Sequence, residues 1–535
     1  MRLWWVVLFA ACGSSSHAPD AGRGSDAGAD ASPHAAVRII AINDFHGGID
    51  SEPGIPGAAA LAAAIDSERT PNTVIVSAGD LIGGSPLTSG LYHDEPTIDV
   101  MNAIGLQYNA VGNHEFDEGA TELLRMQNGG CHPTDGCGNG SSFGGAQFQF
   151  LAANVTYTAT GERIFPAYAI HQIAGVKIAF VGVTTVNTRS QTLASAVTDL
   201  SFADEVTTVN ALVPELKAAG AQAIVVLLHE GGTTNMTDGN SCDGLAGRII
   251  DVTNGFDPAV TWVASAHSHV IYNCMLGGHL LTSAGFHGRA ITVADLDFDL
   301  GAGTLAGITA VNMPVSAMSG RDATVGGIVA EWDQRAEPTA DRVVGTITAD
   351  IGGLGVESQI GDLVTDAMLA GTSPQTTQAA LMNPGGLRSV LGYAKIAPET
   401  VDGQVRYAET FAVQPFSNHV LAVTVTGADL VAALDTWACN PPPLQVAGLT
   451  YTIHPGQPPG SCVTLADVQV GGAPVVAANT YRVAVNSIVA QPASTPSMAN
   501  ATNVVDVGVD LDLLNAYLGA HSPVAPETPS RITQQ

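Results

Sequence analysis

The hexapeptide GNHEFD, residues 112–117, directly follows a short run that we predict to be a β-strand, residues 107–111. It places an amide, an imidazole and carboxylates where a strand ends and a loop begins. In α/β sheets, ligands bind at the carboxyl ends of strands because loops from several strands converge there. In an α/β fold the hexapeptide would therefore lie at the ligand-binding edge of the sheet, with Asn113, His114 and Asp117 as candidate site residues.

Four other strand-like runs end in polar residues of the same kind. Short runs of Val, Ile and Ala are typical of strands buried on both faces. Asp44 and His46 follow residues 37–42, Asp80 follows 73–77, His229 follows 223–228, and His267 and His269 follow 261–265. Any one of these residues is more often a turn cap or a surface residue than a ligand. Five such clusters at five strand ends indicate one shared site.

Strands alternate with helix-like segments, which indicates layered α/β domains, and 535 residues exceed one ordinary core. In the first half we expect another strand at 177–183 and helices at 58–67, 118–127 and 202–219. A helix at 323–336, ended by Glu337 and Pro338, would lead to a second α/β unit. That unit has a predicted helix at 359–369 and strands at 379–383, 420–426 and 481–486. The predicted divisions are 1–12 (signal), 13–36 (flexible tether), 37–320 (catalytic domain), 321–342 (linker helix) and 343–535 (substrate-binding domain).

The charge balance excludes one class of partner. Acidic residues outnumber basic ones by 49 to 19, which gives a formal net charge of −30. Such a chain repels the phosphate backbone, so we expect no nucleic-acid polymer as a partner. A small phosphoester remains a suitable partner because a bound divalent metal ion dominates the local field.

The N-terminus predicts export and anchoring. Arg2 precedes a short apolar segment, residues 3–9, and FAAC at 9–12 resembles a bacterial lipobox in which Cys12 would be lipidated. Phe9 stands where leucine is usual, so a plain secretory signal is the alternative. Residues 13–36 contain almost nothing to bury and should form the tether. We expect attachment to the cell envelope, on its periplasmic or outer surface, with membrane contact only through Cys12.

Six further cysteines favour disulfides, because an even number in an exported chain is typical of them. They fall into three local pairs, although the connectivity stays open. None has the C-x-x-C spacing of a structural zinc cage. They are Cys131, Cys137, Cys242, Cys274, Cys439 and Cys462.

The five clusters closely resemble the motifs of the calcineurin-like metallophosphoesterases, and within them the 5′-nucleotidase family. D-x-H, G-D, G-N-H-E, a strand-terminal His and H-x-H occur in the family's order. The resemblance runs over nearly all of residues 37–524, with Ala266 in place of a frequent glycine. It implies a four-layer α/β/β/α metallophosphoesterase domain, joined by a helix to a C-terminal α/β substrate-binding domain.

The resemblance also implies two divalent metal ions, most suitably zinc or manganese. Two cations about 3.5–4 Å apart neutralise a doubly negative phosphate monoester and activate water for attack on it. Asp80 would bridge the two ions. Asp44, His46 and His269 would complete one site, and Asn113, His229 and His267 the other. His114 would face the phosphoryl group, with Asp117 orienting the imidazole and raising its pKa.

The C-terminal half carries the family's substrate-binding motifs with two departures. NPGGLR at 383–388 resembles N-G-G-G-[IL]-R, and QPFSN at 414–418 resembles Q-P-F-G-N. By this resemblance the substrate contacts are Asn383, Gly385, Gly386, Arg388 and Phe416, with Phe416 as one face of a base-stacking sandwich. The arginine usual before ESQIGDL at 357–363 is absent, and Ile488 stands where a second aromatic is expected. Each stacking face is worth about 1–3 kcal/mol, so base binding should be weakened.

The predicted reaction is hydrolysis of nucleoside 5′-monophosphates to nucleoside and phosphate. The same site could instead serve a cyclic-nucleotide phosphodiesterase, a nucleotide-sugar hydrolase or a broad phosphomonoesterase. A non-catalytic ligand-binding lipoprotein is the alternative of another class. It would be expected to lose His114, Asp117 or a metal ligand, and none is lost.

Overall fold

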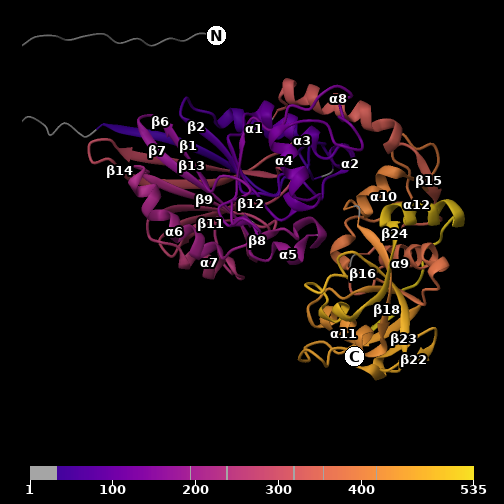
Figure 1. The fold of residues 1–535 in the computed structure, drawn as a ribbon. Coiled ribbons are helices and arrows are strands. Elements are labelled where there is room, and N and C mark those ends of the chain that lie inside the picture. The colour runs from indigo at the N-terminus through magenta and orange to yellow at the C-terminus, as the bar shows by residue number, and fades with distance from the viewer. Residues whose placement is uncertain are drawn as a thin grey trace, which may run out of the picture.

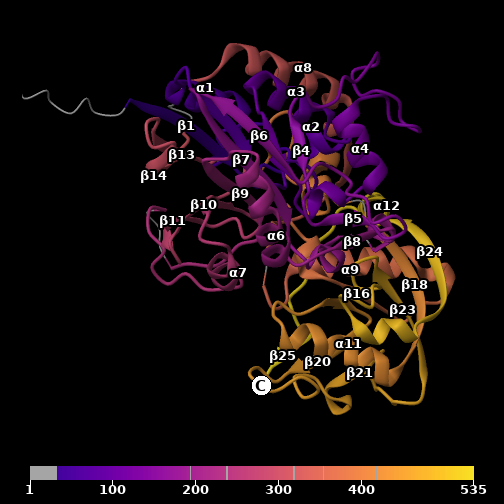
Figure 2. The same cartoon turned by 60° about the vertical axis from the view of Figure 1, so that its left-hand side comes forward.

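A computed structural model describes residues 33–52, 54–192, 194–235, 239–316, 320–353, 355–416 and 418–535. It confirms the predicted fold of two α/β domains (Figures 1 and 2). Helix α8 (Ala323–Ala340) runs along the first domain and leads into the second (Figure 1). Among the described residues, no helix combines the length and apolar character needed to cross a bilayer.

The first domain is built on two six-stranded sheets that pack face to face. One has the order β14-β13-β1-β2-β3-β4 and the other β11-β12-β10-β9-β7-β6. Apolar side chains from both sheets, among them Ile39, Val74, Phe180 and Trp262, form the core between them. The strands of the first sheet are β1 (His34–Ile42), β2 (Thr73–Ser77), β3 (Tyr108–Ala110), β4 (Gln149–Leu151), β13 (Ala290–Asp299) and β14 (Thr304–Pro314). Those of the second are β6 (Tyr168–Ile173), β7 (Val176–Thr184), β9 (Ala223–His229), β10 (Val260–Ser265), β11 (Ile271–Leu276) and β12 (His279–Ala284).

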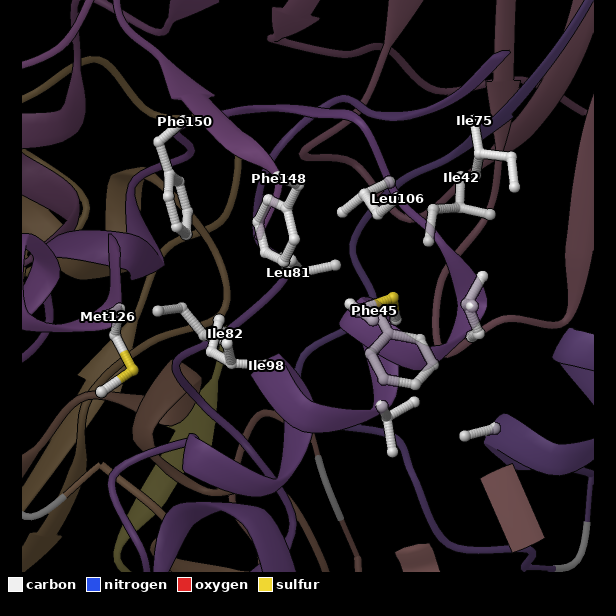
Figure 3. Close-up of a cluster of buried hydrophobic side chains, with 14 of the residues drawn as sticks. Ile42, Phe45, Ile75, Leu81, Ile82, Ile98, Leu106, Met126, Phe148 and Phe150 are labelled. Atoms are coloured by element: carbon white, nitrogen blue, oxygen red, sulfur yellow. The ribbon is translucent and has the colours of Figure 1, made fainter. Parts of the chain in front are cut away.

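Helices cover the outer face of each sheet and complete the four layers. Helices α1 (Ala58–Glu68), α3 (Glu95–Ile104), α4 (Ala120–Asn128) and α8 share one apolar core with the first sheet. Figure 3 shows part of that core, in which Phe45 and Leu81 pack beside Ile42. Helices α6 (Glu205–Ala218) and α7 (Ile249–Gly255) pack on the second sheet. Because Phe45 and Leu81 adjoin Asp44 and Asp80, burial of these apolar residues anchors the loops of the predicted site.

The second domain has a central sheet in the order β19-β16-β23-β18-β24. Helices α9 (Gln359–Gly371) and α12 (Asp510–His521) pack on one face of it. Helix α11 (Gly427–Cys439) and a four-stranded sheet, β22-β21-β20-β25, pack on the other. The central strands are β16 (Ala379–Met382), β18 (His419–Thr426), β19 (Gln445–Ala447), β23 (Thr480–Asn486) and β24 (Thr502–Val509). The smaller sheet holds β20 (Leu449–Ile453), β21 (Val468–Val470), β22 (Ala473–Pro474) and β25 (Ile532–Gln534), and α10 (Tyr407–Val413) precedes β18.

Several predicted boundaries shift by a few residues in the structure, and two of these shifts have a clear physical cause. Strand β1 begins at His34, inside the segment predicted as tether, because His34 pairs with Asp299 of β13. The predicted end of α8 at Glu337 and Pro338 was wrong. A proline removes only one N–H donor, and the helix closes its last turn through the Asp341 N–H, which donates to the Glu337 carbonyl at 2.9 Å.

The three local cysteine pairs are confirmed as disulfides, Cys131–Cys137, Cys242–Cys274 and Cys439–Cys462. The predicted signal, Cys12 and the tether up to residue 32 lie outside the described residues.

Candidate active site

The carboxyl ends of β1, β2, β3, β9 and β10 meet at one edge of the paired sheets and bring the five polar clusters together. Five of the seven predicted metal ligands there have left-handed backbone conformations, which non-glycine residues adopt rarely and at a cost of about 1–3 kcal/mol. Such strain is concentrated at functional sites. The φ angles are 49° at Asp44, 45° at His46, 48° at Asp80, 72° at His267 and 59° at His269.

The first predicted ligand group contains Asp44, His46 and His269, whose ligand atoms lie within 4.8 Å of one another. His46 Nε2 lies 3.0 Å from His269 Nε2 and 3.9 Å from Asp44 Oδ1. His46 Nδ1 donates to the Gly83 carbonyl at 2.8 Å, which leaves the lone pair on Nε2. Burial also lowers the pKa of His46 well below its usual value. A neutral imidazole beside a carboxylate and a second imidazole suits a divalent transition metal ion.

The second group contains Asp80, His229 and His267, again within 4.8 Å of one another. His229 Nε2 lies 3.0 Å from Asp80 Oδ2 and 3.1 Å from Asn113 Oδ1. Burial opposes the charged form of His229, but Asp80 outweighs it and raises the pKa of His229 to about 10. His229 thus faces Asp80 as an imidazolium, and its Nδ1 donates to the Ala78 carbonyl at 3.0 Å. A metal ion could take the place of the Nε2 proton.

Asp80 lies between the two groups. Its Oδ2 is 3.0 Å from His229 Nε2 and 3.6 Å from His46 Nε2. Burial alone would raise the pKa of Asp80, yet His229, His114 and His46 hold it well below the usual value. An ionised, buried carboxylate between two sets of ligand atoms has the chemistry that a bridge between two cations requires.

His114 stands next to both groups without belonging to either. Its Nδ1 lies 2.7 Å from Asp117 Oδ2, and its backbone N–H donates to Asp80 Oδ1 at 2.9 Å. Burial would lower the pKa of His114, but Asp117 and Asp80 raise it to about 9. In the metal-free protein these two carboxylates therefore favour the charged, hydrogen-bond-donating form of the imidazole, and Asp117 holds its orientation.

Glu115 has a role that sequence reasoning missed. This buried carboxylate accepts hydrogen bonds from the backbone N–H groups of Asp80 at 2.9 Å, Leu81 at 2.9 Å and Gly112 at 2.5 Å. It also accepts from Asn109 Nδ2 at 3.1 Å. Glu115 therefore connects the loop that carries Asp80 to the loop that carries Asn113. Its place in GNHEFD was the available signal, but its partners could not be read from the sequence.

A cavity of about 460 Å³ lies between the two domains and reaches the site. The first domain contributes Asn113, His114, Asp117 and His267 to its wall. The second domain contributes all five predicted substrate contacts, Asn383, Gly385, Gly386, Arg388 and Phe416. The Phe416 ring stacks on the His114 ring, with centroids 5.6 Å apart and an interplanar angle of 19°. The structure thus brings the predicted phosphate and substrate residues to one cavity.

Trp437, on α11, is a second aromatic residue in the wall of this cavity. The aliphatic side chain of Ile488 lies in the same wall. Its indole Nε1–H donates to Thr495 Oγ1 at 2.9 Å, which restricts rotation of the ring. The resemblance pointed to the loop after β23 for the second aromatic, where Ile488 stands. No sequence pattern connected Trp437 to the site, because α11 and that loop meet only in the folded domain.

Comparisons with known proteins agree with this arrangement. Residues 37–271 match the family model of the calcineurin-like phosphoesterases, and residues 316–499 match that of the 5′-nucleotidase C-terminal domain. The endonuclease YhcR of Bacillus subtilis is 33% identical over 440 residues, which are 78% of this chain and 34% of that protein. The cell wall protein Lmo0130 of Listeria monocytogenes is 29% identical over 533 residues, 90% of this chain and 66% of that protein. The chain therefore spans less than two thirds of either relative.

Among solved structures, a 5′-nucleotidase precursor from Thermus thermophilus has the same fold. It superposes with a TM-score of 0.76 at 23% identity, covering 93% of this chain and 99% of that one.

Proposed function

Because the chain belongs to the 5′-nucleotidase family, with a calcineurin-like phosphoesterase domain followed by a 5′-nucleotidase C-terminal domain, we propose that it hydrolyses nucleoside 5′-monophosphates to nucleoside and phosphate. One observation carries the proposal: the Asp80 carboxylate lies between two groups of candidate metal ligands at the end of the interdomain cavity.

The catalytic end requires two divalent metal ions, zinc or manganese. Asp80 would hold both, with Asp44, His46 and His269 at one ion and Asn113, His229 and His267 at the other. When bound, such ions neutralise the phosphoryl charge and activate water. His114 adds a donor that this chain supplies itself, because Asp117 orients its imidazole and favours the charged form. That donor stabilises the negative charge that grows on the phosphoryl oxygens in the transition state.

The nucleoside end is formed by the second domain. Arg388 and Asn383 are polar groups in the cavity wall that would bind the substrate, and Phe416 would stack on the base. Ile488 stands where a second aromatic residue is expected. We assign Trp437 as the second aromatic contact to the base instead. The position of Trp437 in the wall and its bond to Thr495 support this assignment.

A substrate panel tests the reaction. We expect phosphate release from AMP to exceed release from a cyclic nucleotide and to be abolished by a chelator and by Asp80→Ala. Conversion of the cyclic nucleotide to the monophosphate, without phosphate release from AMP, would point to a phosphodiesterase. No turnover of any phosphoester in the presence of zinc or manganese would refute catalysis and leave a ligand-binding protein.

The base contact has its own test, with glycerol phosphate as a substrate that lacks a base. Trp437→Ala should lower kcat/KM for AMP about tenfold to a hundredfold, since stacking is worth about 1–3 kcal/mol, and leave glycerol phosphate unchanged. Ile488→Ala is the matched control and should change the AMP value less. Equal losses of kcat/KM for AMP and glycerol phosphate would mean that Trp437 contributes only to the packing of α11.

We further propose that the protein is exported and anchored through Cys12. The support is the lipobox-like FAAC sequence at 9–12, and a similar protein in Listeria carries the name of a cell wall protein. Wild-type protein should fractionate with membranes and Cys12→Ser should not. Equal partitioning of the two would leave a plain secretory signal.

A further inference from the structure

Gln191, which belongs to none of the sequence motifs, contacts the predicted metal ligand His267. It is the last residue of α5 (Thr188–Gln191) in the first domain, and it lines the interdomain cavity. Its amide nitrogen, Nε2, lies 3.1 Å from His267 Nε2. The hydrogen bond at one ring nitrogen of a histidine decides which tautomer forms, and so which nitrogen is left for a metal ion.

The segment that carries Gln191 is held on both sides of that residue. Buried Thr192 donates its N–H to the Thr188 carbonyl at 3.1 Å and its hydroxyl to Asp117 Oδ1 at 3.3 Å. The Ser190 carbonyl accepts from Ser494 Oγ of the second domain, also at 3.3 Å. These contacts keep Gln191 beside His267 without relying on its own amide.

The backbone of His267 is fixed separately from its ring. Its N–H donates to both carboxylate oxygens of Asp44 at 3.0 Å, in a left-handed conformation with φ of 72°. These bonds set neither the rotation of the imidazole nor its tautomer. Among the residues that the structure describes, only Gln191 is hydrogen-bonded to that imidazole.

Two other predicted ligands show what an imidazole ligand needs behind it. His46 and His229 each donate Nδ1–H to a backbone carbonyl, which turns Nε2 toward the ligand group. Metal-binding histidines usually donate their second N–H to a carbonyl or carboxylate, because this bond fixes the tautomer and the ring orientation. For His267 the corresponding acceptor has to come from Gln191, and it would face Nε2 instead of Nδ1.

The Gln191 amide supplies that acceptor if it rotates by half a turn. At present its Nε2 faces the imidazole, whereas its Oε1 is buried and has no hydrogen-bond partner among the described residues. Rotation exchanges the carbonyl oxygen and the NH₂ group, which are close to the same size. Either orientation leaves one end of the amide unpaired, so the rotation costs no additional hydrogen bond. A metal ion on Nδ1 would leave the proton on Nε2 and favour the orientation in which Oε1 accepts it.

We propose that Gln191 positions His267 for metal binding: its side-chain carbonyl accepts the Nε2–H, and Nδ1 is the atom that His267 offers to the ion. This inference rests on the metal centre of the proposed function. The competing explanation is that the Gln191 NH₂ group donates to the lone pair of Nε2. Gln191 would then compete with a metal ion for that nitrogen. The two explanations predict opposite effects of removing the amide.

The zinc affinity of the metal-free protein, measured by competition with a chromophoric chelator, distinguishes them. Gln191→Leu removes the acceptor, and we expect the affinity for one of the two zinc ions to fall about 10–100-fold. Gln191→Glu retains an acceptor oxygen and should restore that affinity. Ser190→Ala is the matched control in the same helix, because its hydroxyl donates to the Asn187 carbonyl at 2.8 Å. It should bind zinc as the wild type does.

A structure of the zinc-loaded wild type tests the inference without a substitution. It should show zinc on His267 Nδ1, at about 2.0–2.1 Å. Zinc on Nε2, or unchanged or tighter zinc binding by Gln191→Leu, would overturn the proposal. An equal loss of affinity in Gln191→Leu and Gln191→Glu would overturn it as well, because the residue would then only fill space. A wild-type protein that binds no zinc or manganese would refute the proposed metal centre itself, whereas the other outcomes concern Gln191 alone.

Discussion

Glu115 provides the sharpest test of how the candidate active site is held together. Four donors meet its buried carboxylate, namely the N–H groups of Asp80, Leu81 and Gly112 and the Asn109 side-chain amide. Glu115→Ala leaves all four without an acceptor, and a buried unsatisfied donor costs about 1–3 kcal/mol. Allowing for relaxation and some entry of water, we expect a loss of about 3–5 kcal/mol, a large part of the 5–15 kcal/mol typical of domains.

The same change should weaken metal binding, because Asp80 loses the contact that positions its backbone. Mutation of groups behind metal ligands typically costs about 10–100-fold in affinity or activity. Glu115→Gln should be intermediate, since one oxygen can still accept while the new NH₂ group faces two N–H donors. Chemical denaturation measures the stability, and competition with a chromophoric chelator measures the metal affinity.

Glu95→Gln is the matched control. Glu95 is also buried, and it pairs with Arg125 at 2.7 Å and accepts the Gly138 N–H at 2.9 Å, away from the predicted ligands. It should lower stability without changing metal affinity. If Glu115→Ala kept wild-type metal affinity, or lost no more stability than Glu95→Gln, Glu115 would not be the connection between the two ligand loops.

The other predictions concern the proposed metal bridge Asp80, the hydrogen-bond donor His114 and the buried carboxyl group of Asp510. Asp80→Ala should lose both catalytic metal ions and all activity, whereas His269→Gln should weaken one site; two catalytic ions retained in Asp80→Ala would exclude the bridge. His114→Ala should retain metal while kcat falls about 10²-fold, as expected for loss of a transition-state donor; an unchanged kcat would make His114 structural. Burial raises the pKa of Asp510 to about 8. Its contribution to stability is therefore greatest below pH about 4 and is lost as pH rises toward 8, at about 1.4 kcal/mol per pKa unit. Asp510→Asn should raise the melting temperature at pH 8 and not at pH 4; an equal effect at both would show that Asp510 ionises freely in the folded protein.

Much of the first domain was predictable because its information is local. The strands that precede Asp44 and Asp80, and the strand that ends at His229, are short apolar runs. Asp44 and Asp80 adopt left-handed backbone conformations shortly after theirs. The boundaries were less predictable where tertiary pairing decides them. Strand β1 extends to His34 only because β13 lies beside it, and α8 passes Pro338 because one missing N–H does not break the last turn.

The sequence alone thus determined the α/β class, the order of the strand-end motifs and the identity of the residues proposed to bind metal and phosphate. The fold class follows from periodicity, and the residue identities follow from local motifs that resemble those of a known family. Only the tertiary structure decided which distant groups meet: the four donors around Glu115, Trp437 in the cavity wall, and Gln191 beside His267. The physical reason is that a hydrogen bond or a cavity depends on angstrom-scale placement of separate segments, which the packing of whole layers sets and no local pattern encodes.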